Sequence, residues 1–175
     1  LFNRNKRIAA PWHVESSVMG QVYSGAASED QAAVKAVAET AGEVLMYSDE
    51  PALTVYHSNA GGMTESSKAV WSRDYPYLTP VESSFDAGAP RFEWDYTATS
   101  AGLGEELRRS GRSIGDPIAI EVMETTSSGR VKALAVRDAN GREIRLTGEE
   151  LRSAVGYSVI RSAMFYVERG GEMFV

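Results

Sequence analysis

Two adjacent glycines, Gly61 and Gly62, constrain the fold of this chain more than any other feature. Glycine adopts positive φ angles at little cost, and a backbone without side chains can approach another chain or a ligand closely. An apolar run at residues 52–56, typical of a strand, leads into the loop that they form. Polar groups suited to a binding site accompany them on His57, Ser58, Asn59 and Thr64. Because Gly, Asn and Ser also dominate ordinary turns, the loop is either a plain strand-to-helix connection or a site.

Length and composition predict one folded domain over residues 1–175. A chain of 175 residues is long enough to bury a self-sufficient core, and its 43% apolar and 24% charged residues are ordinary for a globular protein. No apolar run approaches the roughly 18 residues that a membrane span needs. The net charge is −6 and the basic residues form no long block, which argues against a nucleic-acid partner.

The chain contains no cysteine, which excludes disulfides, thiolate nucleophiles and Cys-based zinc sites. Its two histidines, His13 and His57, are too few and too far apart in sequence to predict a metal centre. We therefore expect no metal and no other cofactor. A Ser-His-Asp triad is also disfavoured, because His57 and Ser58 are neighbours on an extended segment and point to opposite faces.

Hydrophobic patterns predict an α+β fold, in which antiparallel sheets and hairpins are combined with a few short packed helices. Turn signals after residues 126 and 138 predict a three-stranded meander, with strands at residues 117–126, 130–137 and 142–146. Alternating apolar and polar side chains predict a further strand at residues 92–97. Two more hairpins are expected, at residues 44–56 and 164–175.

Caps and helical spacing predict four helices. A capping box that starts at Ser28 predicts the first, and Thr64 is expected to cap a second that ends near Trp71. Ser100 is expected to cap a third, in which Leu103 and Leu107 are apolar and Gly111 marks the end. The fourth is predicted over residues 149–155, opened by Thr147 and Gly148.

Carboxyl groups and aromatic rings are the candidates for sugar chemistry. Glycoside cleavage uses a carboxyl group with a raised pKa, and by residue type the candidates are Glu15, Glu29, Glu39, Glu43, Glu65 and Glu82. Glu65 is the best placed, directly after the glycine loop, but a Glu in a first helical turn is equally explained by the helix dipole. Four aromatic residues are either core anchors or the lining of a groove for sugar rings or a peptide, namely Trp71, Tyr75, Tyr77 and Phe85.

Several separate segments, in the same order, resemble the SpoIID/LytB family over nearly the whole chain. They are QVYSG at residues 21–25, AVKAVAETAGEVLMY at 33–47, YHSNAGGMTE at 56–65, VW at 70–71, PYL at 76–78 and GEELRSAV at 148–155. The resemblance implies a bacterial, extracytoplasmic protein that acts on peptidoglycan in the cell wall. SpoIID-type members are lytic transglycosylases that cleave glycan strands lacking stem peptides during sporulation, and LytB-type members are amidase enhancers.

The chemistry that the resemblance implies is cleavage of the bond from N-acetylmuramic acid to N-acetylglucosamine. One Glu serves as general acid and then base, while the sugar's own 6-hydroxyl attacks the anomeric carbon and gives a 1,6-anhydro product. No metal or nucleotide takes part in that step.

This sequence departs from the family pattern in several places. The family's catalytic Glu precedes an ALKAQAVAARTYAL-like helix that would lie just before Leu1, and a GHGxGMSQ-like motif would follow Val175. Val18, Met19 and Gly20 stand where some relatives carry Cys and His ligands for zinc. Met63 stands where a His is frequent. The resemblance therefore implies no catalytic residue and no metal ligand in this chain.

We expect this chain to be the central portion of such a domain, weak in glycan binding and inactive in cleavage. The residues that would line the glycan groove are His57, Ser58, Asn59, Gly61, Gly62, Thr64, Glu65, Trp71 and Tyr77. A second hypothesis is a non-catalytic interaction module that binds and stimulates a cell-wall amidase, or binds another sporulation or division protein. A third is that another chain from the same precursor supplies the flanking segments.

Overall fold

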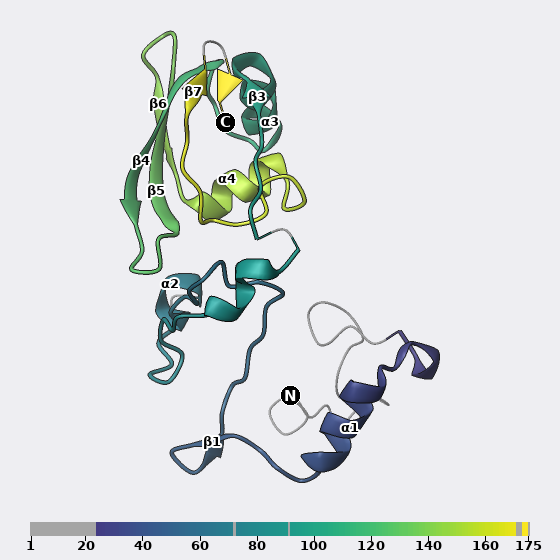
Figure 1. Ribbon diagram of the computed structural model, residues 1–175. Helices are drawn as coiled ribbons and strands as arrows, with labels where there is room; N and C mark the ends of the chain where they lie inside the picture. Colours follow the sequence, from purple (N-terminus) through teal and green to yellow (C-terminus); the bar gives the residue numbers. More distant parts are fainter. Residues whose placement is uncertain (1–23, 72, 91, 171–172, 175) are drawn as a thin grey trace, which may run out of the picture. The chain divides into compact units, whose positions relative to one another are not determined.

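The computed structural model describes residues 24–71, 73–90, 92–170 and 173–174, and along them the chain forms two units, Leu1–Tyr56 and His57–Val175. Helices and antiparallel sheets are both present, so the predicted α+β class is confirmed (Figure 1). The single domain expected over residues 1–175 stays a prediction. No helix in the described ranges is long and apolar enough to cross a membrane.

In the first unit, the described residues form a short 3-10 helix, η1 (Ala26–Ser28), an α-helix, α1 (Gln31–Glu39), and a hairpin of β1 (Met46–Tyr47) and β2 (Glu50–Pro51). The helix is confirmed, but the capping box at Ser28 is wrong. Asp30 is the N-cap, and its carboxylate accepts from the amides of Ala32 and Ala33, at 2.7 and 3.3 Å. The Ser28 hydroxyl instead donates to the Gly25 carbonyl at 2.7 Å.

The hairpin of the first unit is tighter than expected. Tyr47 pairs with Glu50, so only Ser48 and Asp49 form the turn, and both have positive φ angles of 49° and 63°. Short polar residues tolerate this left-handed region, which matches the twist of paired strands. The second strand therefore comes earlier than predicted, and residues 52–56 form no strand.

The second unit is built on the predicted meander, formed by β4 (Pro117–Thr125), β5 (Val131–Asp138) and β6 (Glu143–Leu146). The strand order is β4-β5-β6 and all pairing is antiparallel. The central strand pairs on both sides, with Leu134 opposite Val122 and Leu146. Leu134 and Val136 are fully buried, which gives this sheet its core face.

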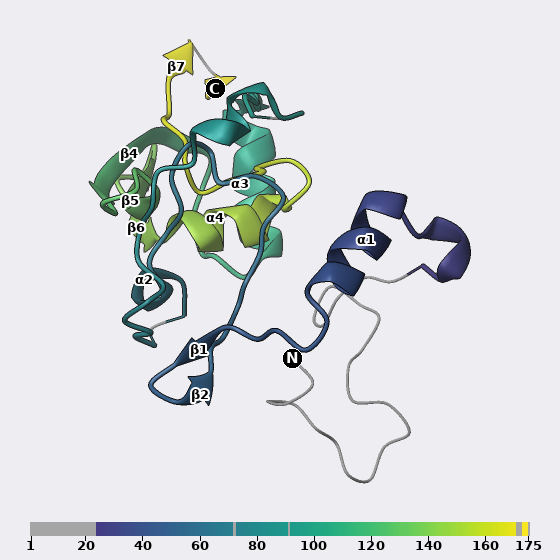
Figure 2. The same ribbon diagram turned by 60° about the horizontal axis from the view of Figure 1, so that its bottom comes forward.

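Two helices cover one face of this sheet, α3 (Ser100–Arg109) and α4 (Gly148–Val155), as both ribbon views show (Figures 1 and 2). Leu103, Leu107 and Leu151 from the helices join the buried side chains of the strands in one hydrophobic core. The helix–sheet approach is close at Gly148, where a Cβ atom would lie 2.6 Å from the Val131 carbonyl oxygen. A glycine is therefore required there for α4 to pack.

The ends of the two helices follow ordinary capping chemistry, with one correction. Thr147 and Glu150 form a capping box at the start of α4, as the position of that helix predicts. Thr99, not Ser100, caps α3 by accepting from the Gly102 amide at 3.1 Å. The Ser100 hydroxyl donates instead to the carbonyl of Pro117.

The strand predicted at residues 92–97 is wrong. These residues alternate between half-buried and exposed, but they lie outside any ladder. Pairing begins only at β3 (Ala98–Thr99), in a small sheet of order β3-β8-β7 with β8 (Met173–Phe174) and β7 (Arg169–Gly170). The final hairpin is thus present, but its first strand is β7 and not residues 164–167.

The core of the second unit offers a direct stability test. We expect Leu134→Ala to lower the free energy of unfolding by about 2–5 kcal/mol, because it leaves a cavity where a fully buried side chain packed. Urea unfolding followed by circular dichroism measures the loss. Leu45→Ala is the matched control, since Leu45 is 70% exposed, and a comparable loss in both variants would contradict this assignment of the core.

Candidate functional site

The loop at residues 57–65 opens the second unit, and its backbone has the conformation that the glycines predict. Gly61 and Gly62 have φ angles of 68° and 89°, which side-chain-bearing residues rarely adopt. The Asn59 carboxamide oxygen accepts from the Gly61 amide at 2.7 Å and fixes the turn locally. The residue between them, Ala60, is buried.

A second segment, residues 79–86, runs beside this loop and holds it by hydrogen bonds. The Asp86 carboxylate accepts from the Ala60 amide at 2.7 Å, and the Gly62 carbonyl accepts from the Ser83 amide at 2.9 Å. Thr64 makes two further bonds to Val81, one through its amide (2.9 Å) and one through its hydroxyl (2.8 Å). The loop is therefore hydrogen-bonded to this segment at Ala60, Gly62 and Thr64.

Thr64 does not cap the next helix, contrary to the prediction. Its hydroxyl is used by Val81, and α2 (Ser67–Trp71) begins three residues later. The hydroxyl of Ser66 takes the capping role by accepting from the Ala69 amide at 3.3 Å. Thr64 is thus a loop anchor.

Arg130, which precedes β5, fastens the loop to the meander. Its guanidinium donates to the carbonyl of Ala60 at 2.7 Å and to the carbonyl of Met63 at 3.0 Å. It also donates to the Ser128 hydroxyl at 2.8 Å. We call this group, Arg130 with Ser128 and Glu65, the Arg130 clamp.

Glu65 completes the clamp with both carboxylate oxygens engaged. One oxygen accepts from the Ser128 hydroxyl at 2.6 Å, and the other accepts from the Ser66 amide at 2.7 Å. Burial raises the pKa of Glu65, but hydrogen bonds from Ser128, Thr126 and Ser66 outweigh it, so the pKa lies below its ordinary value of 4.5. A general acid needs a raised pKa, so Glu65 is suited to a structural role as a charged hydrogen-bond acceptor.

The remaining predicted groove residues differ in exposure. His57 and Ser58 are exposed, and Trp71 is 49% exposed at the end of α2. Tyr77 is half-buried against Tyr75, with ring centroids 5.9 Å apart. None of the four aromatic residues proposed as core anchors is buried, and Phe85 is 96% exposed.

The structure contains a cavity that sequence reasoning missed, and it adjoins the loop. A methyl group on Gly61 would lie 3.3 Å from the sulfur of Met164, a residue that lines this cavity of about 810 Å³. None of the nine predicted groove residues is part of its lining. The alternating pattern of residues 92–97 was the available sequence signal, and it predicted a strand instead of one side of a cavity.

Two clamp residues, Ser128 and Arg130, were also missed as functional candidates. Ser128 entered only as a turn signal, although its side chain is buried and bonded to Glu65. Across the described residues, no group of three or more His, Asp or Glu side chains is arranged to hold a metal ion. Glu15 and His13 lie outside the described residues.

The lowered pKa of Glu65 predicts a pH-dependent contribution to stability. The carboxylate stabilises the folded state above pH 4.5, and this contribution is lost as the pH falls through the lower pKa of the folded protein. We expect Glu65→Gln to unfold at lower urea than wild type at about pH 7, and the difference between the two midpoints to shrink at an acidic pH below the lowered pKa of Glu65. Glu82→Gln, which changes an exposed carboxylate beside Met63, should match wild type at both pH values; a constant difference for Glu65→Gln would contradict the role of its charge.

Known proteins are similar to this chain in sequence. It is 30% identical over 137 residues to stage II sporulation protein D of Bacillus subtilis (strain 168), and equally so to that of Bacillus amyloliquefaciens, covering 78% of this chain and 37% of each relative. It is also 37% identical over 83 residues to the amidase enhancer of Bacillus subtilis (strain 168), covering 47% of this chain and 11% of that protein. The chain thus spans little more than a third of the length of the first two relatives.

A family model described as "Domain of unknown function (DUF8618)" matches residues 77–173. This region contains the meander, both packed helices and the whole lining of the cavity, while the loop at residues 57–65 lies before it. The names of the relatives confirm the resemblance drawn from the sequence motifs. The chain therefore belongs to the family of that domain, DUF8618, and to the SpoIID/LytB group of proteins.

Proposed function

We propose that this chain is part of a bacterial, extracytoplasmic cell-wall protein and that it binds peptidoglycan glycan strands lacking stem peptides. The observation that carries the proposal is the similarity to stage II sporulation protein D along 78% of the chain. The geometry supports it, because the loop at residues 57–65 is held firmly while His57 and Ser58 stay exposed. A rigid loop loses little conformational entropy when a ligand binds.

Trp71 is the side chain best suited to hold a sugar ring at this loop. It is 49% exposed at the end of the short helix that follows the loop, so part of its ring is free to stack. Tyr77 has less free surface, since it packs against Tyr75. Binding should therefore depend on Trp71 more than on Tyr77.

Binding by this chain does not bring cleavage through Glu65. Lytic transglycosylase chemistry requires a carboxyl group that is protonated before the leaving oxygen departs. Glu65 is the carboxyl group of the loop itself, but its pKa is lowered and its two oxygens already accept hydrogen bonds from Ser128 and Ser66. We propose a binding role for the loop and no turnover by the chain alone.

Sedimentation with glycan strands stripped of stem peptides tests the proposal. We expect the chain to pellet with the strands, and Trp71→Ala to weaken binding about tenfold, which corresponds to about 1.4 kcal/mol. Tyr157→Ala is the control, because Tyr157 is 54% exposed and stacks beneath the Arg152 guanidinium, outside the loop. Equal loss in both variants would contradict a specific role for Trp71, and 1,6-anhydro sugars in the supernatant would contradict the absence of cleavage.

A second candidate is a module that binds and stimulates a cell-wall amidase, favoured by the 37% identity to the amidase enhancer over 83 residues. Partner sites contain exposed apolar side chains, and Val70, Trp71 and Val81 are 53%, 49% and 59% exposed in this part of the second unit. Pull-down with a purified amidase, in the absence of glycan binding, would favour this candidate. Glycan binding without amidase capture would favour the first.

A further inference from the structure

We propose that the cavity beside the loop binds the N-acetylglucosamine ring of a glycan strand. This inference rests on the proposed function, since it names where such a strand would place one of its uncharged rings. The cavity measures about 810 Å³, within the range of roughly 300–1,000 Å³ typical of small-molecule sites. All of its lining residues lie between 92 and 168, inside the region matched by the family domain.

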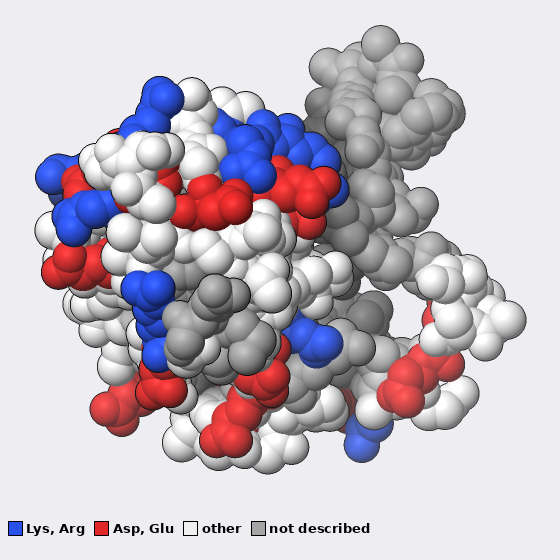
Figure 3. Space-filling view, turned by 90° about the horizontal axis from the view of Figure 1, so that it is seen from above, with Lys and Arg blue, Asp and Glu red and all other residues white. Residues whose placement is uncertain are grey.

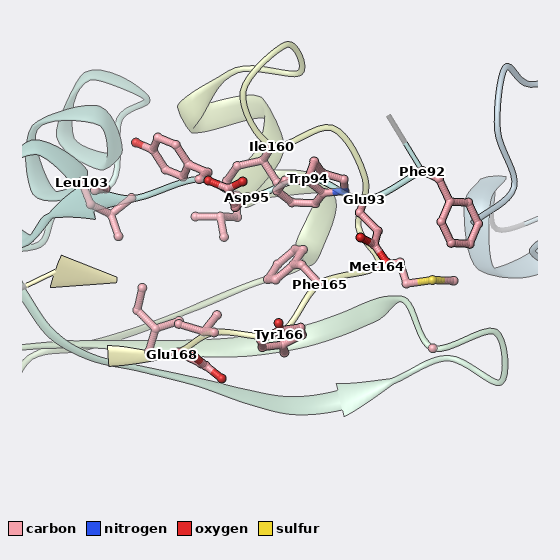
Figure 4. Close-up of a pocket in the computed structure, with 16 residues that line it drawn as sticks. Phe92, Glu93, Trp94, Asp95, Leu103, Ile160, Met164, Phe165, Tyr166 and Glu168 are labelled. Atoms are coloured by element: carbon pink, nitrogen blue, oxygen red, sulfur yellow. The ribbon is translucent and has the colours of Figure 1, made fainter. Parts of the chain in front are cut away.

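Two extended segments, residues 92–96 and 164–168, contribute most of the lining of the cavity, and each carries aromatic residues (Figure 4). Trp94 meets Phe165 edge to face, with ring centroids 6.5 Å apart. Tyr166, on the same segment as Phe165, is 78% exposed. Flat apolar rings of this kind pack against the C–H faces of a pyranose ring, and half-exposed rings have surface left for that contact.

The charged residues of the lining are all acidic, namely Glu93, Asp95 and Glu168, and all three are exposed. Within the described part of the chain, none of them forms an ion pair or a hydrogen bond. Unpaired carboxylates accept hydrogen bonds from sugar hydroxyls and from the amide of an N-acetyl group. The cavity therefore offers stacking surfaces and acceptors together.

Elsewhere in the second unit, opposite charges lie side by side. Arg137 pairs with Glu143, and Arg112 with Glu150, each at 2.8 Å. The face in Figure 3 likewise shows basic and acidic side chains next to one another. The three acidic residues, with no basic residue in the lining, give the cavity a negative charge.

Negative charge selects between the two sugars of the strand. N-acetylmuramic acid carries a lactyl carboxylate when its stem peptide is absent, and like charges repel it from Glu93, Asp95 and Glu168. N-acetylglucosamine has no charge and meets no such repulsion. Of the two, the uncharged ring fits the cavity.

Both walls of the cavity contain backbone amide and carbonyl groups that are available for hydrogen bonds with a ligand. Neither residues 93–97 nor residues 165–168 form backbone hydrogen bonds with other described backbone groups. Extended segments of this kind present amide and carbonyl groups that a hydroxyl-rich ligand can satisfy. A methyl group on Gly61 would lie 3.3 Å from the sulfur of the lining residue Met164, so a strand lying along the loop could place a neighbouring ring in the cavity.

The three tryptophans of the chain allow the cavity and the loop to be tested separately. Indole N–H resonances of Trp12, Trp71 and Trp94 are followed by NMR while chitotetraose, a neutral tetramer of N-acetylglucosamine, is added to the full chain. We expect the Trp94 resonance to shift, and Tyr166→Ala to weaken that binding about tenfold. Glu168→Gln should weaken it about threefold.

Controls match each variant, since Tyr157→Ala and Glu105→Gln change exposed residues of the same type outside the cavity and should leave the affinity unchanged. An unshifted Trp94 during a titration with glycan strands that moves Trp71 overturns the cavity assignment and leaves the proposed function standing. A Trp94 shift with chitotetraose, together with no response of Trp71 to glycan strands, supports the cavity and contradicts the loop.

Two further ligands in the same titration test the preference for an uncharged ring. N-acetylmuramic acid should leave Trp94 in place, and a shift as large as that caused by chitotetraose would overturn the selection for an uncharged ring. A tetramer of glucosamine, which carries amino cations, distinguishes a cation site from a sugar site. If it shifts Trp94 while chitotetraose does not, the assignment to N-acetylglucosamine is wrong.

Discussion

The hydrogen bonds from Arg130 to the carbonyls of Ala60 and Met63 join the loop at residues 57–65 to the meander. The sequence separation is large, so the bonds close a long loop and define where residues 57–65 lie relative to the meander. Burial lowers the pKa of Arg130, and the nearby Glu65 carboxylate opposes that shift. The Glu65 carboxylate is therefore the electrostatic partner of Arg130 within the clamp, and it cannot also serve as a free acid.

Local chemistry was enough to predict much of the fold. The meander followed from turn signals at Gly129 and Gly141, which both have positive φ angles, and from β-forming runs around them. The third helix was also predicted, and its apolar residues Leu103 and Leu107 lie in the core. These features depend on neighbours in sequence, which is why a single sequence is sufficient to find them.

The errors in the helix caps arose where another group competed for the same hydroxyl, from 17 residues away at Thr64 and from three residues away at Ser28. Thr64 has the form of an N-cap, but Val81 takes its hydroxyl, and Asp30 replaces Ser28 because the Ser28 hydroxyl bonds to Gly25. Residues 92–97 have the alternation of a strand without a pairing partner. The roles of Ser128 and Arg130 depend on contacts more than 60 residues away in sequence, which no local pattern reveals.

The cavity walls and the glycine loop differ in mechanical character. The loop is cross-linked at Ala60, Gly62, Met63 and Thr64, so displacing it means breaking several hydrogen bonds at once. Residues 93–97 and 165–168 carry no ladder, so the distance between them can change by side-chain repacking alone. The walls of the cavity can therefore adjust while the loop beside it stays fixed. Such a site can accept ring substituents of different bulk, such as an acetylated or a free amine, while keeping the strand in one register.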